Sequence, residues 1–164
     1  MKENICVIGL YNNFVKSLAK SISDSFDMFF ADITELVQFD LLDVDNARNL
    51  CGDDYVKKVE NNKVKTISSY SNTLFTLDYS LLNNDDNLNR IKQSSYIIYL
   101  KLSKDELKKN MLNNNLKHQE INLKIDLYDY RNAFCEKYAD FVIDCNNKGV
   151  RDIVKLTKQA FLGV

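Results

Sequence analysis

The sequence predicts an α/β protein in which helices cover both faces of a five-stranded parallel sheet, giving three αβα layers. Five short apolar runs, at 4–9, 26–31, 73–77, 95–101 and 139–145, have the length of strands rather than helices. Segments with apolar residues at helical spacing alternate with these runs, as in parallel strands joined by helices. The run 95–101 is rich in β-branched and aromatic residues and is expected to be central and fully buried.

Length and composition indicate one domain over residues 1–164, which is long enough to bury a sizeable core. The 22 basic and 23 acidic side chains leave a net charge of −1, so neither nucleic acid nor a membrane surface is expected as a partner. No apolar run approaches the roughly 18 residues of a membrane span and no export signal is recognisable, which predicts a cytoplasmic location. The four cysteines lack metal-like spacing, so no metal site is expected.

The first half of the chain alternates strands and helices. Residues 4–9 form the first strand, and apolar residues at helical spacing between 15 and 22 place a helix after it. The second strand, 26–31, ends at Asp32, and another helix opens at 34–37. Residues 33–60 are expected to form a small helical insertion, from which a helix returns to the sheet before residue 70.

The second half continues the alternation. After the third strand at 73–77, an Asn/Asp cluster at 83–87 marks a loop or a helix start, and a helix is expected through 88–92. Ser103 and Glu106 form a capping box that starts a helix after the fourth strand. The three asparagines at 113–115 break that helix, and a long helix is expected over 121–138. The last strand, 139–145, precedes a closing helix over 150–161.

Three residues fall at the expected carboxyl ends of strands, where parallel α/β sheets bind their ligands. Gly9 follows the first strand, Asp32 the second and Asp78 the third. The sequence therefore predicts a binding site at this edge of the sheet.

Gly9 stands where a phosphate-binding loop would begin. In the form G-x-x-x-x-G-K-[ST], backbone amides surround the phosphates, the lysine reaches the β- and γ-phosphates, and the hydroxyl binds Mg²⁺. Counted from Gly9, the second glycine and the lysine fall on Phe14 and Val15. A Lys-Ser pair follows one residue late, at Lys16 and Ser17, which turns the pair by about 100° on a helix. The arrangement of a nucleotide kinase is expected here with most of its loop chemistry missing.

Five segments match one family of small kinases in order and spacing: 4–9 with 18–20, 30–36, 52–60, 96–101 and 131–140. The last is the most specific, because it is similar to the motif R-x-P-x-Y followed by A-D. On these segments the chain resembles shikimate kinase, a P-loop kinase with the nucleoside-monophosphate-kinase fold. The resemblance covers nearly the whole chain and implies a substrate-binding-type insertion at 33–60 and a lid-type region at 112–120.

The resemblance also implies substrate-binding residues. The D-x-D motif of the family reads D-I-T from Asp32, so Asp32 is the expected catalytic carboxylate, and it is expected to contact the substrate together with Thr34. Lys57 replaces the arginine that binds the substrate carboxylate, and Arg131 keeps the position of another functional arginine. Asp78 replaces the first residue of a glycine triplet and adds negative charge beside the ligand. A small carboxylate is the implied ligand.

For the nucleotide, the resemblance implies MgATP as phosphoryl donor, so Mg²⁺ and ATP are expected only if the unusual loop functions. The lid-type region carries no arginine, and Lys117 is its candidate cation for the phosphates. In a functional loop, asparagines able to adopt positive φ would take the place of glycines. The residues expected to contact a nucleotide are Gly9, Asn12, Asn13, Lys16 and Ser17.

Three functions stay open. The preferred hypothesis is a catalytically degenerate shikimate-kinase-like protein with a binding or regulatory role. The first alternative is an active ATP-dependent shikimate kinase, or a related small-molecule kinase, with an atypical phosphate loop. The second is a structural or assembly subunit, whose protein partner the sequence does not identify. Two residues have structural alternatives as well: Asp32 as the N-cap of the helix after it, and Arg131 as a helix-packing arginine.

Overall fold

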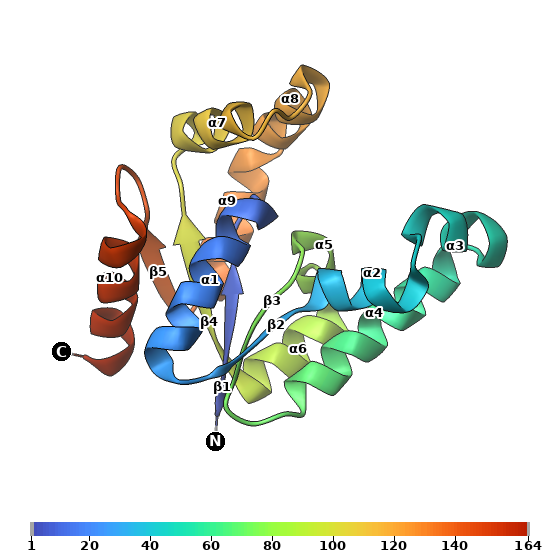
Figure 1. Cartoon of the computed structure of the whole chain (residues 1–164), viewed down its shortest axis with the longest axis horizontal. Helices are drawn as coiled ribbons and strands as arrows, with labels where there is room; N and C mark the ends of the chain where they lie inside the picture. Colours follow the sequence, from blue (N-terminus) through green and yellow to red (C-terminus); the bar gives the residue numbers. More distant parts are fainter. Residues whose placement is uncertain (1, 164) are drawn as a thin grey trace.

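The predicted strands form one parallel sheet. The structure is a computed structural model that describes residues 2–163, and its five strands lie in the order β2-β3-β1-β4-β5 (Figure 1). Their bounds are β1 Asn4–Ile8, β2 Phe29–Asp32, β3 Thr73–Thr76, β4 Ser95–Lys101 and β5 Phe141–Asp144. The predicted fold class is confirmed.

Helices connect the strands and cover both faces of the sheet. Within residues 2–163 none of them is both long and apolar enough to cross a membrane. Their bounds are α1 Asn12–Phe26, α2 Ile33–Leu41, α3 Val44–Cys51, α4 Asp53–Ser68, α5 Tyr79–Leu82, α6 Asp85–Ser94, α7 Lys104–Asn113, α8 His118–Asp126, α9 Tyr128–Tyr138 and α10 Val150–Leu162.

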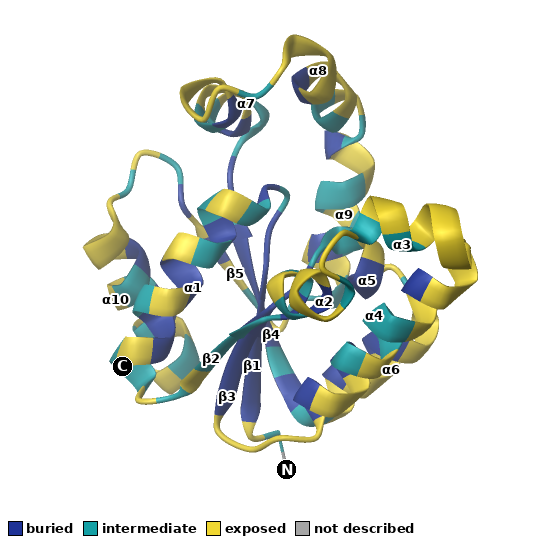
Figure 2. Ribbon diagram, turned by 45° about the vertical axis from the view of Figure 1, so that its right-hand side comes forward, coloured by how far each residue is buried: buried dark blue, intermediate teal, exposed yellow. Residues whose placement is uncertain are grey.

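Side chains of β1 point alternately to the two faces, as strand geometry requires. Ile5 and Val7 belong to a core shared with α1, α7 and α10, whereas Cys6 and Ile8 belong to a core shared with α2, α4 and α6. Figure 2 shows the buried residues concentrated in the strands and on the helix faces that turn toward them. The central strand is therefore covered on both sides, and its carboxyl end is held in place by two cores.

Strand β4 has the predicted bounds, but the prediction that it is fully buried is wrong. Tyr96 and Lys101, near its two ends, are only partly buried. Strand β5 pairs with β4 only from Ile98 onward, and the ring of Tyr96 packs edge-on against Phe161 of α10 and, tilted, against Phe141 at the start of β5. Lys101 reaches outward to an ion pair with Glu136.

Several boundaries differ from the predictions, and the last strand covers Phe141–Asp144 rather than 139–145. The second strand begins at Phe29 rather than at residue 26, because α1 continues to Phe26 and ends at Asp27 in the left-handed conformation. The helix expected over 121–138 is divided at Leu127 into α8 and α9. Ile121 of α8 and Tyr128, the first residue of α9, are buried in the same core, and Cys135 farther along α9 is buried in the other.

Two helical segments project beyond the carboxyl ends of the strands. Residues 33–60 fall in α2, α3 and the first half of α4, which form the arm on the right of Figure 1. Residues 112–120 fall at the end of α7, the following turn and the start of α8, at the top of the same view. Helix α3 has no buried residue, so this arm is held mainly through α2 and α4.

Candidate functional site

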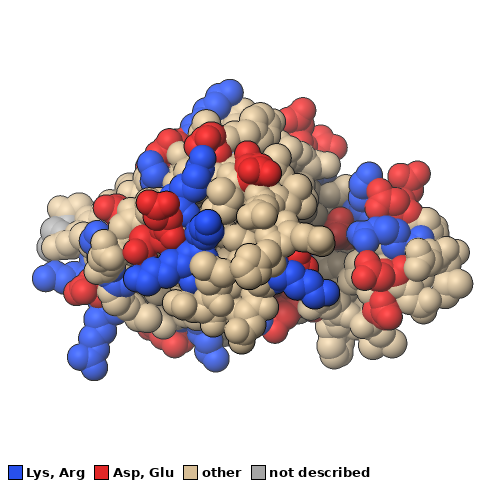
Figure 3. Space-filling view, turned by 90° about the horizontal axis from the view of Figure 1, so that it is seen from above, with Lys and Arg blue, Asp and Glu red and all other residues tan. Residues whose placement is uncertain are grey.

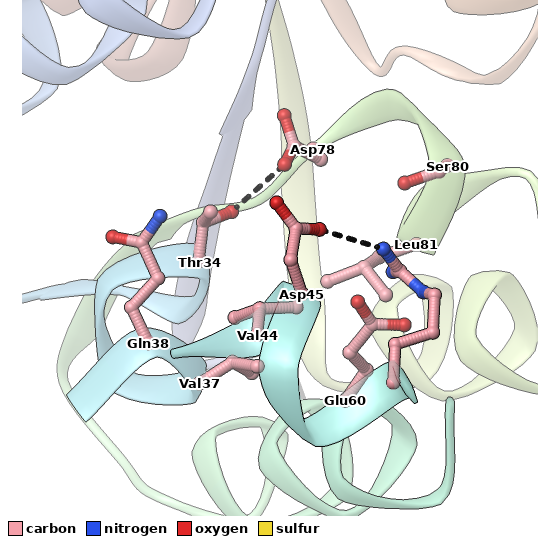
Figure 4. A pocket seen from close by; sticks show the side chains of 10 residues that line it. Thr34, Val37, Gln38, Val44, Asp45, Glu60, Asp78, Ser80 and Leu81 are labelled. Atoms are coloured by element: carbon pink, nitrogen blue, oxygen red, sulfur yellow. Dashed lines mark hydrogen bonds and ion pairs between the residues drawn. The ribbon is translucent and has the colours of Figure 1, made fainter. Parts of the chain in front are cut away.

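A cleft lies at the carboxyl edge of the sheet, where the sequence predicted a site. It consists of two adjoining cavities of about 370 and 330 Å³ that share Thr34, Gln38 and Asp78. The first, the α3-side cavity, is shown in Figure 4, and its other lining residues are Val37, Val44, Asp45, Arg48, Glu60, Ser80 and Leu81. The second, the α1-side cavity, is also lined by Asn12, Asn13, Lys16, Asp32 and Glu35.

The turn between β1 and α1 is shorter than the loop of the form G-x-x-x-x-G-K-[ST]. β1 ends at Ile8 and α1 begins at Asn12, so only residues 9–11 lie between them. Val15, at the position of the loop lysine, is 2% exposed in the core. A Cβ atom built on Gly9 would lie 2.4 Å from Cγ2 of Val15, so the valine packs directly on the glycine. The space between Val15 and Asp32 does not admit a water-sized molecule.

The late Lys-Ser pair does not supply the missing groups. Lys16 lines the α1-side cavity, but its ammonium is paired with the carboxylate of Glu35 on α2. The hydroxyl of Ser17 donates to the carbonyl of Phe14 at 3.1 Å and does not line the cleft. Of the residues predicted to bind a nucleotide, Asn12, Asn13 and Lys16 therefore lie in the cleft, and Gly9 and Ser17 lie outside its lining.

Asp32 has two structural partners. As the last residue of β2 and the N-cap of α2, it accepts a hydrogen bond from the Glu35 amide at 2.8 Å. Its other carboxylate oxygen accepts from the Thr76 hydroxyl of β3 at 3.1 Å. Asp32 therefore acts as the N-cap of α2, as the structural alternative for this residue stated. Its catalytic role stays a prediction.

Asp78 joins three elements at the centre of the cleft. Its carboxylate accepts hydrogen bonds from the side-chain amide of Asn12 on α1 and from the hydroxyl of Thr34 on α2, the latter at 3.2 Å. Burial raises the pKa of this carboxyl above its ordinary value, while the bond from Thr34 and the charges of Lys124 and Arg131 act in the opposite direction. The position held by glycine in the resembled family is here a partly buried acceptor.

The two predicted cations of the substrate site lie outside the cavity lining. Lys57 is exposed on α4 and pairs with Asp53 one turn earlier, at 2.7 Å. Arg131 stacks its guanidinium on the ring of Tyr79, with 4.9 Å between its Cζ atom and the ring centroid. Tyr79 follows Asp78 directly and the charge of Arg131 lowers the pKa of Asp78, so Arg131 lies at the rim of the cleft.

Arg48 and Glu60 in the cavity were not predicted. Arg48 lines the α3-side cavity and donates to Asp45 at 3.2 Å and to Asp53 at 3.1 Å. In Figure 3, seen from above, acidic and basic side chains lie side by side on this projecting arm. Burial raises the pKa of Glu60, and Arg48 lowers it. The sequence held one signal for Arg48, since it is the single arginine within 33–60.

The cation near Asp78 on the α8 side of the cleft differs from the predicted one. Lys117 is exposed and forms no ion pair with another residue in 2–163. Lys124 on α8 is partly buried, and its charge lowers the pKa of Asp78. The positive charge on this side of the cleft therefore comes from the middle of α8 rather than from its start.

The raised pKa values of Asp78 and Glu60 predict a pH dependence of stability. A carboxyl that binds its proton more tightly in the folded state loses stability as pH rises above its unfolded pKa. We expect the wild type, relative to an Asp78→Asn/Glu60→Gln variant, to lose unfolding free energy between about pH 4 and pH 7, measured by urea titration. Asp144 is the matched control, because the backbone amide of Asn146 lowers its pKa. Relative to Asp144→Asn, the wild type should gain stability as pH rises toward about 4 and change little above pH 5, and equal slopes for both variants would contradict the assignment.

Comparison with solved structures finds the same fold in small kinases, although no protein-family model and no curated protein matched the sequence. Shikimate kinase from Aquifex aeolicus superposes with a TM-score of 0.80 at 19% identity, over 98% of this chain and 96% of that chain. Shikimate kinase from Acinetobacter baumannii, in complex with shikimate, gives 0.83 at 16% identity, over 99% and 94%. A gluconokinase from Sinorhizobium meliloti gives 0.63 at 12% identity, over 99% and 94%. At these identities the likeness shows the fold, and it confirms the predicted P-loop kinase-like architecture.

Proposed function

Because the chain has the fold of the shikimate kinases, we propose that it binds a small hydroxylated carboxylic acid in the cleft without transferring a phosphoryl group to it. This corresponds to a degenerate kinase with a binding or regulatory role. The two parts of the proposal, loss of nucleotide chemistry and retention of a small-molecule site, rest on different residues.

The β1–α1 turn is the observation that carries the first part. A phosphate loop needs several residues of free backbone to direct its amides at the phosphates and a lysine to neutralise them. Here residues 9–11 are the whole turn, and Val15 is buried against Gly9. The nearest lysine, Lys16, is already paired with Glu35. These residues do not fit the triphosphate of MgATP.

The composition of the cleft supports the second part. Its two cavities fall within the range of roughly 300–1,000 Å³ that is usual for small-molecule sites. Arg48 inside the α3-side cavity and Arg131 at the rim offer guanidinium groups to a carboxylate. The carboxylates of Asp45, Glu60 and Asp78 are acceptors for hydroxyl groups. An acid that carries several hydroxyls matches both kinds of group.

Electrostatics limits the affinity. Three carboxylates line the α3-side cavity, and its one cation, Arg48, is already shared between Asp45 and Asp53. An added anion gains attraction from Arg48 and Arg131 but is repelled by Asp78. We therefore expect binding to be weak and to weaken further as salt is added.

Calorimetry with MgATP and shikimate, each alone and together, tests the proposal. MgATP at millimolar concentration should give no binding heat and should leave the melting temperature within about 1 °C. Shikimate should bind, Arg131→Ala should weaken this binding about tenfold or more, and Asp78→Gly should strengthen it. Arg151→Ala on α10 is the matched control, because it removes an arginine far from the cleft in the fold.

The alternatives correspond to other results of the same experiment. A rise of several degrees with MgATP, together with phosphorylated product, would favour an active kinase with an atypical loop. Undetectable or equal binding of shikimate in the wild type and both cleft variants would favour the structural or assembly subunit.

A further inference from the structure

A separate cavity of about 320 Å³ lies at the opposite edge of the sheet from the cleft. It is formed by the last turn of α4 and the end of α6, the two helices that lead into the amino ends of β3 and β4. Its lining residues are Lys65, Ser68, Ser69, Arg90, Gln93 and Ser94. It shares no residue with the cleft, and none of its residues enters the proposed function.

The lining contains cations and donors but no carboxylate. Lys65 and Arg90 form no ion pair within residues 2–163, whereas many of the other basic side chains do. Three serines, Gln93 and two exposed basic residues thus line one cavity, and of the serine hydroxyls those of Ser69 and Ser94 already have partners in Thr66 and Ser95. This chemistry is opposite to that of the α3-side cavity, where carboxylates predominate.

The hydroxyl of Ser68 is the unusual group. Ser68 is 9% exposed, and its Oγ atom is buried without a hydrogen-bond partner among the described residues. Serines in helices normally bond back to a preceding carbonyl, as Ser23 does to Lys20 at 2.7 Å and Ser69 to Thr66 at 2.7 Å. Leaving a buried hydroxyl unpaired costs free energy, and an acceptor in the adjoining cavity would remove that cost.

We propose that this cavity binds the phosphate group of a small phosphate monoester. The guanidinium of Arg90 can donate two parallel hydrogen bonds to phosphate oxygens, and Lys65 adds a second positive charge. The Ser68 hydroxyl donates to a third oxygen after rotation about χ1. A volume of about 320 Å³ exceeds the space that one phosphate ion needs, so the cavity also accommodates the organic part of the ester.

The helix ends oppose an anion, but their carbonyls are largely paired. The C-terminus of a helix carries partial negative charge on its last carbonyls. In α4, the carbonyls of Thr66 and Ile67 accept the amides of Ser69 and Tyr70, each at 3.1 Å. In α6, the carbonyl of Ile91 accepts the amide of Ser95. This pairing reduces the field of the helix ends, and Lys65 and Arg90 outweigh what is left.

Titration with glycerol phosphate, followed by the amide NMR shifts of residues 65–69 and 90–95, tests the site. We expect saturable shifts, with affinity reduced about fivefold or more by Arg90→Gln and by Ser68→Ala. Ser68→Ala removes an unpaired buried hydroxyl, so it should fold at least as stably as the wild type, which a melting curve checks. Arg151→Gln on α10 should leave the affinity unchanged.

The source of the phosphate group is distinguished by a parallel titration with inorganic phosphate. Tighter binding of glycerol phosphate supports the monoester, whereas tighter binding of the free ion assigns the site to inorganic phosphate and overturns the monoester. Shifts reproduced by sodium chloride at equal ionic strength would overturn the site itself. Unchanged affinity in both Arg90→Gln and Ser68→Ala would overturn it as well.

Discussion

Replacing Val15 by lysine is expected to lower the free energy of unfolding by more than about 3 kcal/mol, because it places an uncompensated ammonium in the core. Position 15 is where a phosphate loop counted from Gly9 carries its lysine. This single change therefore restores the lysine of the motif but not its second glycine or the length of its loop. Urea unfolding at pH 7 measures the loss. Addition of MgATP should not recover the lost melting temperature, and recovery by several degrees would contradict the packing of this turn.

A double-mutant cycle is the control for steric packing at the same contact. Gly9→Ala alone should cost about 1–3 kcal/mol, because its new Cβ atom would lie 2.4 Å from Cγ2 of Val15 and 3.3 Å from the Leu100 carbonyl oxygen. Val15→Ala should also destabilise the fold by opening a cavity. The double variant should lose less than the sum, by about 1 kcal/mol, since the alanine at 9 then occupies space that the valine has left. Strict additivity would mean that the two side chains do not meet.

Asp32→Ala is expected to lower the unfolding free energy by about 2 kcal/mol, because it removes the N-cap of α2 and the acceptor of the Thr76 hydroxyl. Asp32→Asn should retain most of that stability, since asparagine caps helices as well as aspartate does. Thr76→Val is the matched control for the second bond and should cost about 1 kcal/mol. Thermal or urea unfolding of the three variants measures these differences.

The same variants separate a structural role of Asp32 from a catalytic one. If Asp32 served as a catalytic base, Asp32→Asn would keep its stability and abolish phosphoryl transfer from MgATP. In a protein without transfer activity, Asp32→Asn changes neither property. A stable Asp32→Asn variant that loses measurable wild-type activity would contradict the proposed function.

Sequence patterns predicted the elements well because those patterns are local. Apolar runs of strand length and helical spacing located the five strands, and parallel topology placed Gly9, Asp32 and Asp78 at one edge. The burial of Tyr96 was predicted wrongly because it depends on how its ring packs against Phe141 and Phe161, which is a tertiary property. The break at Leu127 has no glycine or proline in the sequence to signal it.

The candidate site was less predictable, because it depends on which way side chains point. Lys57 finds a partner on its own helix, in Asp53, and so lies away from the cavity. Arg48 belongs to a helix without buried residues, and its direction is set by pairing with Asp45 and Asp53. The one-residue displacement of Lys16 was visible in the sequence, but the shortness of the turn before it became clear only when the start of α1 was known.

The contact between Val15 and Gly9 also limits how this protein could evolve through single amino-acid substitutions. A nucleotide-binding turn needs extra backbone between β1 and α1, which substitution alone does not supply, and it needs Val15 to leave the core. Lysine at 15 without the insertion costs stability, and an insertion that keeps Val15 separates the valine from the glycine it covers. Each single step passes through a less stable protein, so selection acting on one change at a time would retain the present turn.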